Sequence, residues 1–245
     1  MKSTQKSLGL SFMVIALILA VQVSHALASQ PKFVTESGEF ALTFTGSGAE
    51  GKLEVLPQGS IIRFVNCRES SSTGTISTST TIEATKVIFK GCAATLPSLG
   101  ANVNCQNTKN SGEIVTNLLE GSLIYVKAGS PETGIDLEPE STPEFAKFTC
   151  GSFLKETISV TESVIGIVTP VNASFGVTFT VSFSQKDGHQ EPEGYLASSG
   201  CSFVKNVLMT TGSGVDTFGP LQSGVQGTET IKTSQPIKIS ATKCA

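Results

Sequence analysis

The sequence has no tryptophan, two tyrosines and two histidines in 245 residues. One of the histidines, His25, lies within the first 28 residues. A catalytic base elsewhere in the chain would therefore have to be His189 or a carboxylate. No serine lies in a G-x-S-x-G motif, and no two cysteines have the C-x-x-C spacing common in zinc sites. Basic residues do not cluster and the formal net charge is −3, so we expect no nucleic-acid partner.

The first 28 residues predict a cleaved signal peptide with a helical apolar segment. Lys2 and Lys6 give a positive N-terminal region, residues 8–23 are apolar and uncharged, and residues 26–28 read A-L-A, an A-x-A cleavage site. The apolar run is shorter than the roughly 20 residues of a spanning helix, so cleavage after Ala28 is preferred over retention as an anchor. No other apolar run approaches that length. We expect a secreted, extracellular protein with no membrane span after cleavage.

The pattern of the remaining chain predicts β-structure. Residues 176–184 alternate strictly, with Val177, Phe179, Val181 and Phe183 on one face, which is typical of a half-buried strand. Residues 164–168 are apolar on both faces, as expected for a central strand buried on both sides. We therefore predict an all-β fold, an antiparallel sandwich or barrel. It forms one domain over residues 29–245; the alternative is two β subdomains split near residue 111.

Three further segments carry local predictions. Residues 69–81 are almost all Ser, Thr and Gly, and a hairpin is preferred over a flexible linker because strands flank them closely. Residues 127–147 contain five acids and three prolines between two lysines and are interpreted as a loop-rich acidic segment. Residues 203–209 fit a strand or a short helix equally well.

The cysteines predict a disulfide framework, because all of them follow the cleavage site and their number is even. The six are Cys67, Cys92, Cys105, Cys150, Cys201 and Cys244. The preferred pairing among 15 possible ones begins with Cys92–Cys105, which bracket one loop. Cys201–Cys244 follows because these residues mark the start and the end of expected neighbouring strands. Cys67–Cys150 remains by elimination.

One glycine motif invites a functional interpretation. Residues 46–51 match G-x-G-x-x-G, the dinucleotide-binding fingerprint. That site needs a helix directly after the glycines, because the helix N-terminus binds the phosphates. A short apolar stretch and Pro57 follow instead. A hairpin turn is therefore the preferred interpretation.

Two acidic regions are candidates for catalysis or calcium binding. His189 lies in a polar turn with Asp187, Glu191 and Glu193, where an exposed loop histidine is the preferred interpretation. The segment with Asp136 and Glu138 is the second calcium candidate, and a solvated loop is preferred there. We expect no catalytic residue, no metal ion and no cofactor.

Several motifs from Gly112 onward follow one another in a characteristic order. They are GEIVTN (112–117), LEGSLIY (119–125), GIDLEP (134–139), FAKFTC (145–150) and VIGIVTPVN (164–172). Together they resemble a family of uncharacterised secreted proteins of soil actinobacteria. The resemblance implies an exported, β-rich protein and transfers no functional residue.

These observations favour a non-catalytic extracellular interaction or structural protein with a cell-envelope or extracellular ligand. The alternative is a secreted hydrolase that uses Glu191, Glu193 or the acidic segment, and it would gain support from two such carboxylates in one cleft with raised pKa values. A glycan-binding module is a further alternative. It is weakened by the scarcity of aromatic rings suited to sugars, with only Tyr125 and Tyr195 besides the phenylalanines.

Overall fold

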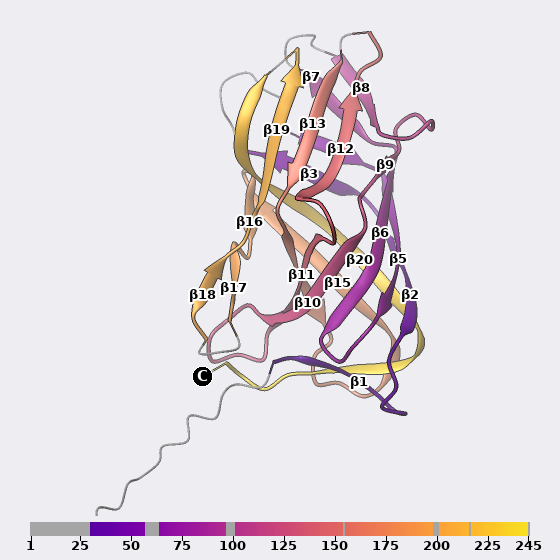
Figure 1. The fold of residues 1–245 in the computed structure, drawn as a ribbon, viewed down its shortest axis with the longest axis vertical. Helices are drawn as coiled ribbons and strands as arrows, with labels where there is room; N and C mark the ends of the chain where they lie inside the picture. Colours follow the sequence, from indigo (N-terminus) through magenta and orange to yellow (C-terminus); the bar gives the residue numbers. More distant parts are fainter. Residues whose placement is uncertain are drawn as a thin grey trace, which may run out of the picture.

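The computed structural model describes residues 30–56, 64–96, 101–153, 155–197, 201–215 and 217–244. Within these ranges every regular element is a strand, which confirms the all-β prediction (Figure 1). The signal peptide and its cleavage site lie outside the described residues, so the boundaries 1–28 and 29–245 stay predictions.

A first closed ring is formed by eight strands that pair antiparallel, each with the next and the last with the first. In order around the ring they are β5 (Glu69–Ile76), β6 (Thr81–Lys90), β10 (Leu119–Tyr125), β11 (Thr133–Pro139), β14 (Val164–Thr169), β15 (Gly176–Lys186), β20 (Phe218–Ser240) and β2 (Leu42–Gly48). An eight-stranded barrel has an interior just wide enough for side chains or for one small ligand.

A second closed ring shares β20 with the first. From β20 it continues through β3 (Gly51–Val55), β4 (Phe64–Cys67), β7 (Ala93–Leu96), β8 (Ala101–Gln106), β12 (Glu144–Cys150), β13 (Glu156–Thr161) and β19 (Leu208–Gly214). Figure 1 shows the second ring above the first, with β20 in yellow passing from one to the other. Each ring contains strands from before and after residue 111.

Five short strands add to the first ring from outside. β1 (Lys32–Thr35) pairs with the end of β20, and β9 (Ile114–Val115) pairs with β6. The others are β16 (His189–Glu191), β17 (Gly194–Leu196) and β18 (Phe203–Lys205), which extend from β15 and β10. Residues 203–209, which fitted strand or helix, thus contain strand β18 and the start of β19, with Asn206 and Val207 between them.

The glycine motif at residues 46–51 does not form the expected hairpin. β2 and β3 do not pair with each other; they follow one another along the same edge of β20. β2 pairs with residues 229–233 and β3 with residues 223–226. The motif is therefore the crossing point from the first ring to the second.

The two strands that carried the sequence prediction lie in the first ring, as expected. Phe179 and Val181 on β15 are buried, and Phe183 is partly buried against the core. Val177 is 40% exposed, contrary to the alternation, because the register with β20 shifts between Gly176 and Thr178. β14 is buried on both faces, which confirms the prediction for residues 164–168.

Two polar segments also form strands of this ring. The Ser/Thr-rich residues 69–81 form β5 and the turn of the β5–β6 hairpin, which confirms the predicted hairpin. The acidic segment was predicted to be loop-rich, and this is wrong: it contains β11 and the start of β12. Alternation explains the difference, since Ile135 and Leu137 face the ring interior while Asp136 faces outward between them.

The disulfides are Cys67–Cys92, Cys105–Cys150 and Cys201–Cys244. The prediction for Cys201–Cys244 is confirmed, and the other two predicted pairs are wrong. Four cysteines form one row across neighbouring strands of the second ring. In order along the row they are Cys67 on β4, Cys92 directly before β7, Cys105 on β8 and Cys150 on β12. The ends of this row are separated by three strand spacings, about 14 Å, which no disulfide can bridge. A Cys92–Cys105 bond would therefore leave two cysteines unpaired.

Tryptic mapping without reduction tests this row. Trypsin releases residues 64–68, 91–109 and 148–155, which contain Cys67, both Cys92 and Cys105, and Cys150. We expect these three peptides to elute as one covalent cluster. If peptide 91–109 is closed on itself and the other two peptides are joined to each other, the pairing described above is contradicted.

Candidate functional site

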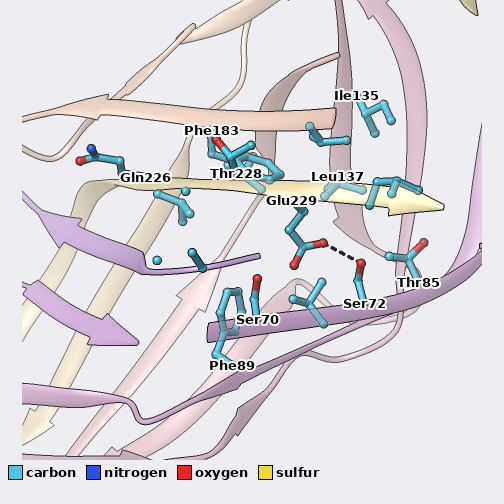
Figure 2. A pocket seen from close by; sticks show the side chains of 18 of the residues that line it. Ser70, Ser72, Thr85, Phe89, Ile135, Leu137, Phe183, Gln226, Thr228 and Glu229 are labelled. Atoms are coloured by element: carbon cyan, nitrogen blue, oxygen red, sulfur yellow. Dashed lines mark hydrogen bonds between the residues drawn. The ribbon is translucent and has the colours of Figure 1, made fainter. Parts of the chain in front are cut away.

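A cavity of about 80 Å³ lies inside the first ring, close to the junction with the second (Figure 2). Most of its wall is apolar and comes from β6, β11, β14, β15 and β20. Ile135 and Leu137 are on one side, and Phe89 and Phe183 lie toward the junction. The cavity is about half as large as an engineered apolar cavity of about 150 Å³ that binds benzene. It can hold a small molecule or a short alkyl chain.

Small residues on two neighbouring strands leave this space unfilled. Gly46 on β2 lies opposite Ser72 on β5, and Gly48 lies opposite Ser70. A Cβ atom on Gly46 would collide with Ser72 Oγ and approach Glu229 Oε2 to 2.8 Å. The glycines therefore make room for polar groups that point inward from β5 and β20.

Among the described residues, Glu229 supplies the carboxylate in the wall of the cavity. Val225, Glu229 and Ile231 alternate along β20 and all line the cavity. Ser72 Oγ donates a hydrogen bond of 2.6 Å to Glu229 Oε2, drawn as a dashed line in Figure 2. Among the described residues no cation pairs with Glu229. Glu229 is only partly buried, and the Ser72 hydroxyl orients its carboxylate toward the cavity.

A second polar group in the cavity has no partner. Thr85 on β6 is 3% exposed and lines the same cavity as Glu229. No hydrogen bond to its Oγ1 exists among the described residues. A buried hydroxyl without a partner costs roughly 1–3 kcal/mol. This cost makes Thr85 Oγ1 a ready partner for a polar group of a ligand.

The cavity reaches the surface where the strand pairing is interrupted. Gly48 pairs with Glu229 and Lys52 pairs with Gln226, but residues 49–51 have no paired partners on β20. Glu50 lies at this opening, which leads into a groove of about 1130 Å³ on the outside, lined by Arg68 among others. The change from one ring to the next therefore creates the entrance.

The interior of the second ring has a cavity of its own, about 70 Å³ in volume. Phe89, Phe145, Val225 and Gly51 line both cavities and so separate them. One continuous apolar core extends through the two rings. Among the described residues no carboxylate lines this second space, so Glu229 and Thr85 distinguish the first cavity as the candidate site.

The predicted acidic turn is exposed and lies outside both rings. Asp187 and Gly188, both at positive φ, form the two-residue turn between β15 and β16. His189 is exposed, as predicted, and its Nδ1 lies 3.0 Å from Glu193 Oε1. The pKa of Glu193 is lowered, mainly by a hydrogen bond from Gln222 and to a smaller extent by the contact with His189. A lowered pKa suits a surface ion pair rather than a catalytic acid.

The structure places Asp136 and Glu138 on β11, so the prediction of a solvated loop is wrong. They line an outer groove of about 320 Å³ that also contains both tyrosines, Tyr125 and Tyr195. Burial raises the pKa of Asp136, although hydrogen bonds from Ser163 and Asn206 oppose the shift. Burial, together with the negative charge of Asp136, raises the pKa of Glu138.

Asp136 serves as a tether within this groove. Ser163 Oγ donates to its Oδ1 over 2.7 Å, and Asn206 Nδ2 donates to its Oδ2 over 2.8 Å. Asn206 follows β18, so the two bonds attach an outer strand and the β13–β14 turn to β11. Both oxygens of this carboxylate are therefore already used in holding the fold.

The described residues contain neither a cluster of metal ligands nor a membrane-spanning helix. No three His, Cys, Asp or Glu side chains there lie close enough together to hold a metal ion. In the same ranges there is no helix with the length and apolar character required to cross a membrane.

No local sequence pattern marks the residues that matter in the cavity. Glu229 lies between Thr228 and Thr230 in a polar stretch that shows no apolar alternation, and Thr85 lies between Ala84 and Lys86. The glycines of residues 46–51 stand out in the sequence, but they do so as a match to a dinucleotide-binding motif. Their role, making room for Ser72 and Glu229, depends on a pairing between strands far apart in the sequence.

Comparison with protein-family models, with curated proteins and with solved structures finds no match to this chain. The resemblance to secreted actinobacterial proteins therefore stays a prediction. Function has to be argued from the interior of the first ring and from the charges that line it.

A pair of identical substitutions tests whether Thr85 lacks a partner. Thr85→Val removes an unpaired hydroxyl, so we expect the free energy of unfolding in urea to stay constant or rise by about 1 kcal/mol. The control is Thr210→Val. Thr210 is fully buried, and its hydroxyl donates to Ser223 Oγ over 2.7 Å. Loss of this hydrogen bond should lower the free energy of unfolding by roughly 1–3 kcal/mol. Equal destabilisation by both substitutions would show that Thr85 is hydrogen-bonded.

Proposed function

We propose that this chain is an exported, non-catalytic binding protein whose first ring holds a small, mainly apolar molecule. The observation that carries the proposal is the unfilled apolar cavity in a closed ring, with an entrance at the ring junction. Ligand pockets are typically apolar spaces with a few placed polar groups, and Glu229, Ser72 and Thr85 are such groups here.

The closed ring favours binding because it is formed before the ligand arrives. Every strand of the ring is paired on both sides, so little ordering is needed on binding. The small volume sets a limit on affinity. A ligand of about five non-hydrogen atoms can gain at most about 7 kcal/mol, which corresponds to micromolar affinity at best.

Export is supported by the cysteines and by the N-terminal sequence. All six cysteines are in disulfides, which indicates an oxidising compartment. The predicted signal peptide would direct the chain there. A binding protein outside the cell needs a stable scaffold, and each disulfide contributes roughly 2–4 kcal/mol to stability.

The hydrolase alternative rests on the groove of Asp136 and Glu138. These carboxylates share one groove and both have raised pKa values, which is the condition set for that alternative. However, Asp136 already accepts hydrogen bonds at both oxygens, and Glu191 and Glu193 lie in the exposed turn. The ring interior is therefore the better-supported site.

Xenon binding tests the proposal, because xenon enters small apolar cavities. We expect ¹²⁹Xe NMR of the disulfide-bonded protein to show a bound-state shift that saturates with protein concentration. Ser70→Leu should abolish it, because Ser70 lines the cavity and its larger replacement would fill the space. Thr73→Leu on the exposed face of the same strand should leave it unchanged. Equal xenon shifts in wild type and Ser70→Leu would overturn the proposal.

A further inference from the structure

The charged residues that line the cavity itself are both acidic, whereas the outer groove beyond its entrance also contains Lys52 and Arg68. The two acids are Glu229 in the wall and Glu50 at the entrance. Among the described lining residues there is no lysine, arginine or histidine. Inside the cavity, a ligand with a carboxylate or phosphate head would meet two negative charges and no positive one. Anionic amphiphiles such as fatty acids are therefore disfavoured.

We infer that the ligand of the first ring is a small organic cation, an alkylammonium whose nitrogen pairs with Glu229. This inference rests on the proposed function, because it names the ligand class of the same cavity. The alkyl part would occupy the apolar wall, and the nitrogen would supply the countercharge that Glu229 lacks among the described residues.

The hydrogen-bonding capacity of Glu229 fits such a nitrogen. Ser72 occupies Oε2 alone, and no described residue donates to Oε1. An alkylammonium carries three N–H donors and no acceptor, so it matches an unoccupied carboxylate oxygen. Hydrogen bonds between two charged groups are about twice as strong as those between neutral groups. A neutral alcohol of the same length would therefore bind more weakly.

The aromatic wall also favours a cation. Five phenylalanines line the cavity: Phe44, Phe89, Phe145, Phe179 and Phe183. The face of an aromatic ring carries negative partial charge and attracts alkylammonium groups within about 6 Å. Thr85 Oγ1 adds an unpaired acceptor to the same interior. Acid, aromatic faces and hydroxyl thus all favour a donor with positive charge.

Two probes of equal length test the inference, n-butylammonium and n-butanol, titrated into the full disulfide-bonded protein at pH 7 and followed by NMR. We expect the dissociation constant of butylammonium to be at least about tenfold lower than that of butanol. In Glu229→Gln, whose amide oxygen can still accept from Ser72, this preference should fall to about twofold or less while butanol binding is retained. Glu120→Gln, an exposed acid on β10 outside the cavity, should keep the preference.

The outcomes separate the inference from the proposed function. If butanol binds in the cavity and butylammonium binds no more tightly, the inference is overturned and the proposed function stands. If neither probe binds and xenon also fails, the proposed function is overturned as well. If Glu120→Gln removes the preference to the same extent as Glu229→Gln, the preference reflects overall charge, and the assignment to Glu229 is wrong.

Discussion

The architecture depends on one strand, β20, which must satisfy its backbone hydrogen bonds in two rings at once. Its 23 residues pair first with β19 and β3 and then with β15 and β2. Because β2 and β3 run along the same edge, the chain has to cross between rings there, at residues 49–51. The interruption of pairing at that crossing is also the entrance to the cavity. The continuity of β20 thus positions the site as well as the fold.

The interior of the first ring differs from a filled barrel core in a few positions only. Gly46 and Gly48 supply no side chain, and the serines opposite them supply little volume. Such a void gives up packing contacts that larger side chains would make. The polar groups add a further cost, because Thr85 Oγ1 has no partner among the described residues. Both features reduce stability and both favour binding, which is the pattern expected of a functional site.

The sequence predicted those parts of the fold that depend on local pattern. The apolar alternation of residues 176–184 predicted β15, and the continuous apolar run of residues 164–168 predicted β14. The β5–β6 hairpin was predicted because expected strands flank residues 69–81 closely. Pairing between distant strands could not be predicted, and most of β20 shows no apolar alternation; only its end does, where Ile237, Ile239 and Ala241 alternate with polar residues. The same limitation affected the cysteines, since the order of β4, β7, β8 and β12 decides which pairs can form. Glu229 stayed hidden because its neighbours Thr228 and Thr230 give no apolar signal.

The central claim is that the first ring binds a small cation through Glu229. A crystal structure of the protein soaked with n-butylammonium tests it most directly. The account predicts electron density inside the first ring, with the nitrogen within hydrogen-bond distance of Glu229 and the alkyl chain against the apolar wall. Density confined to the outer groove beside Asp136 and Glu138, with the ring interior unchanged, would contradict the claim.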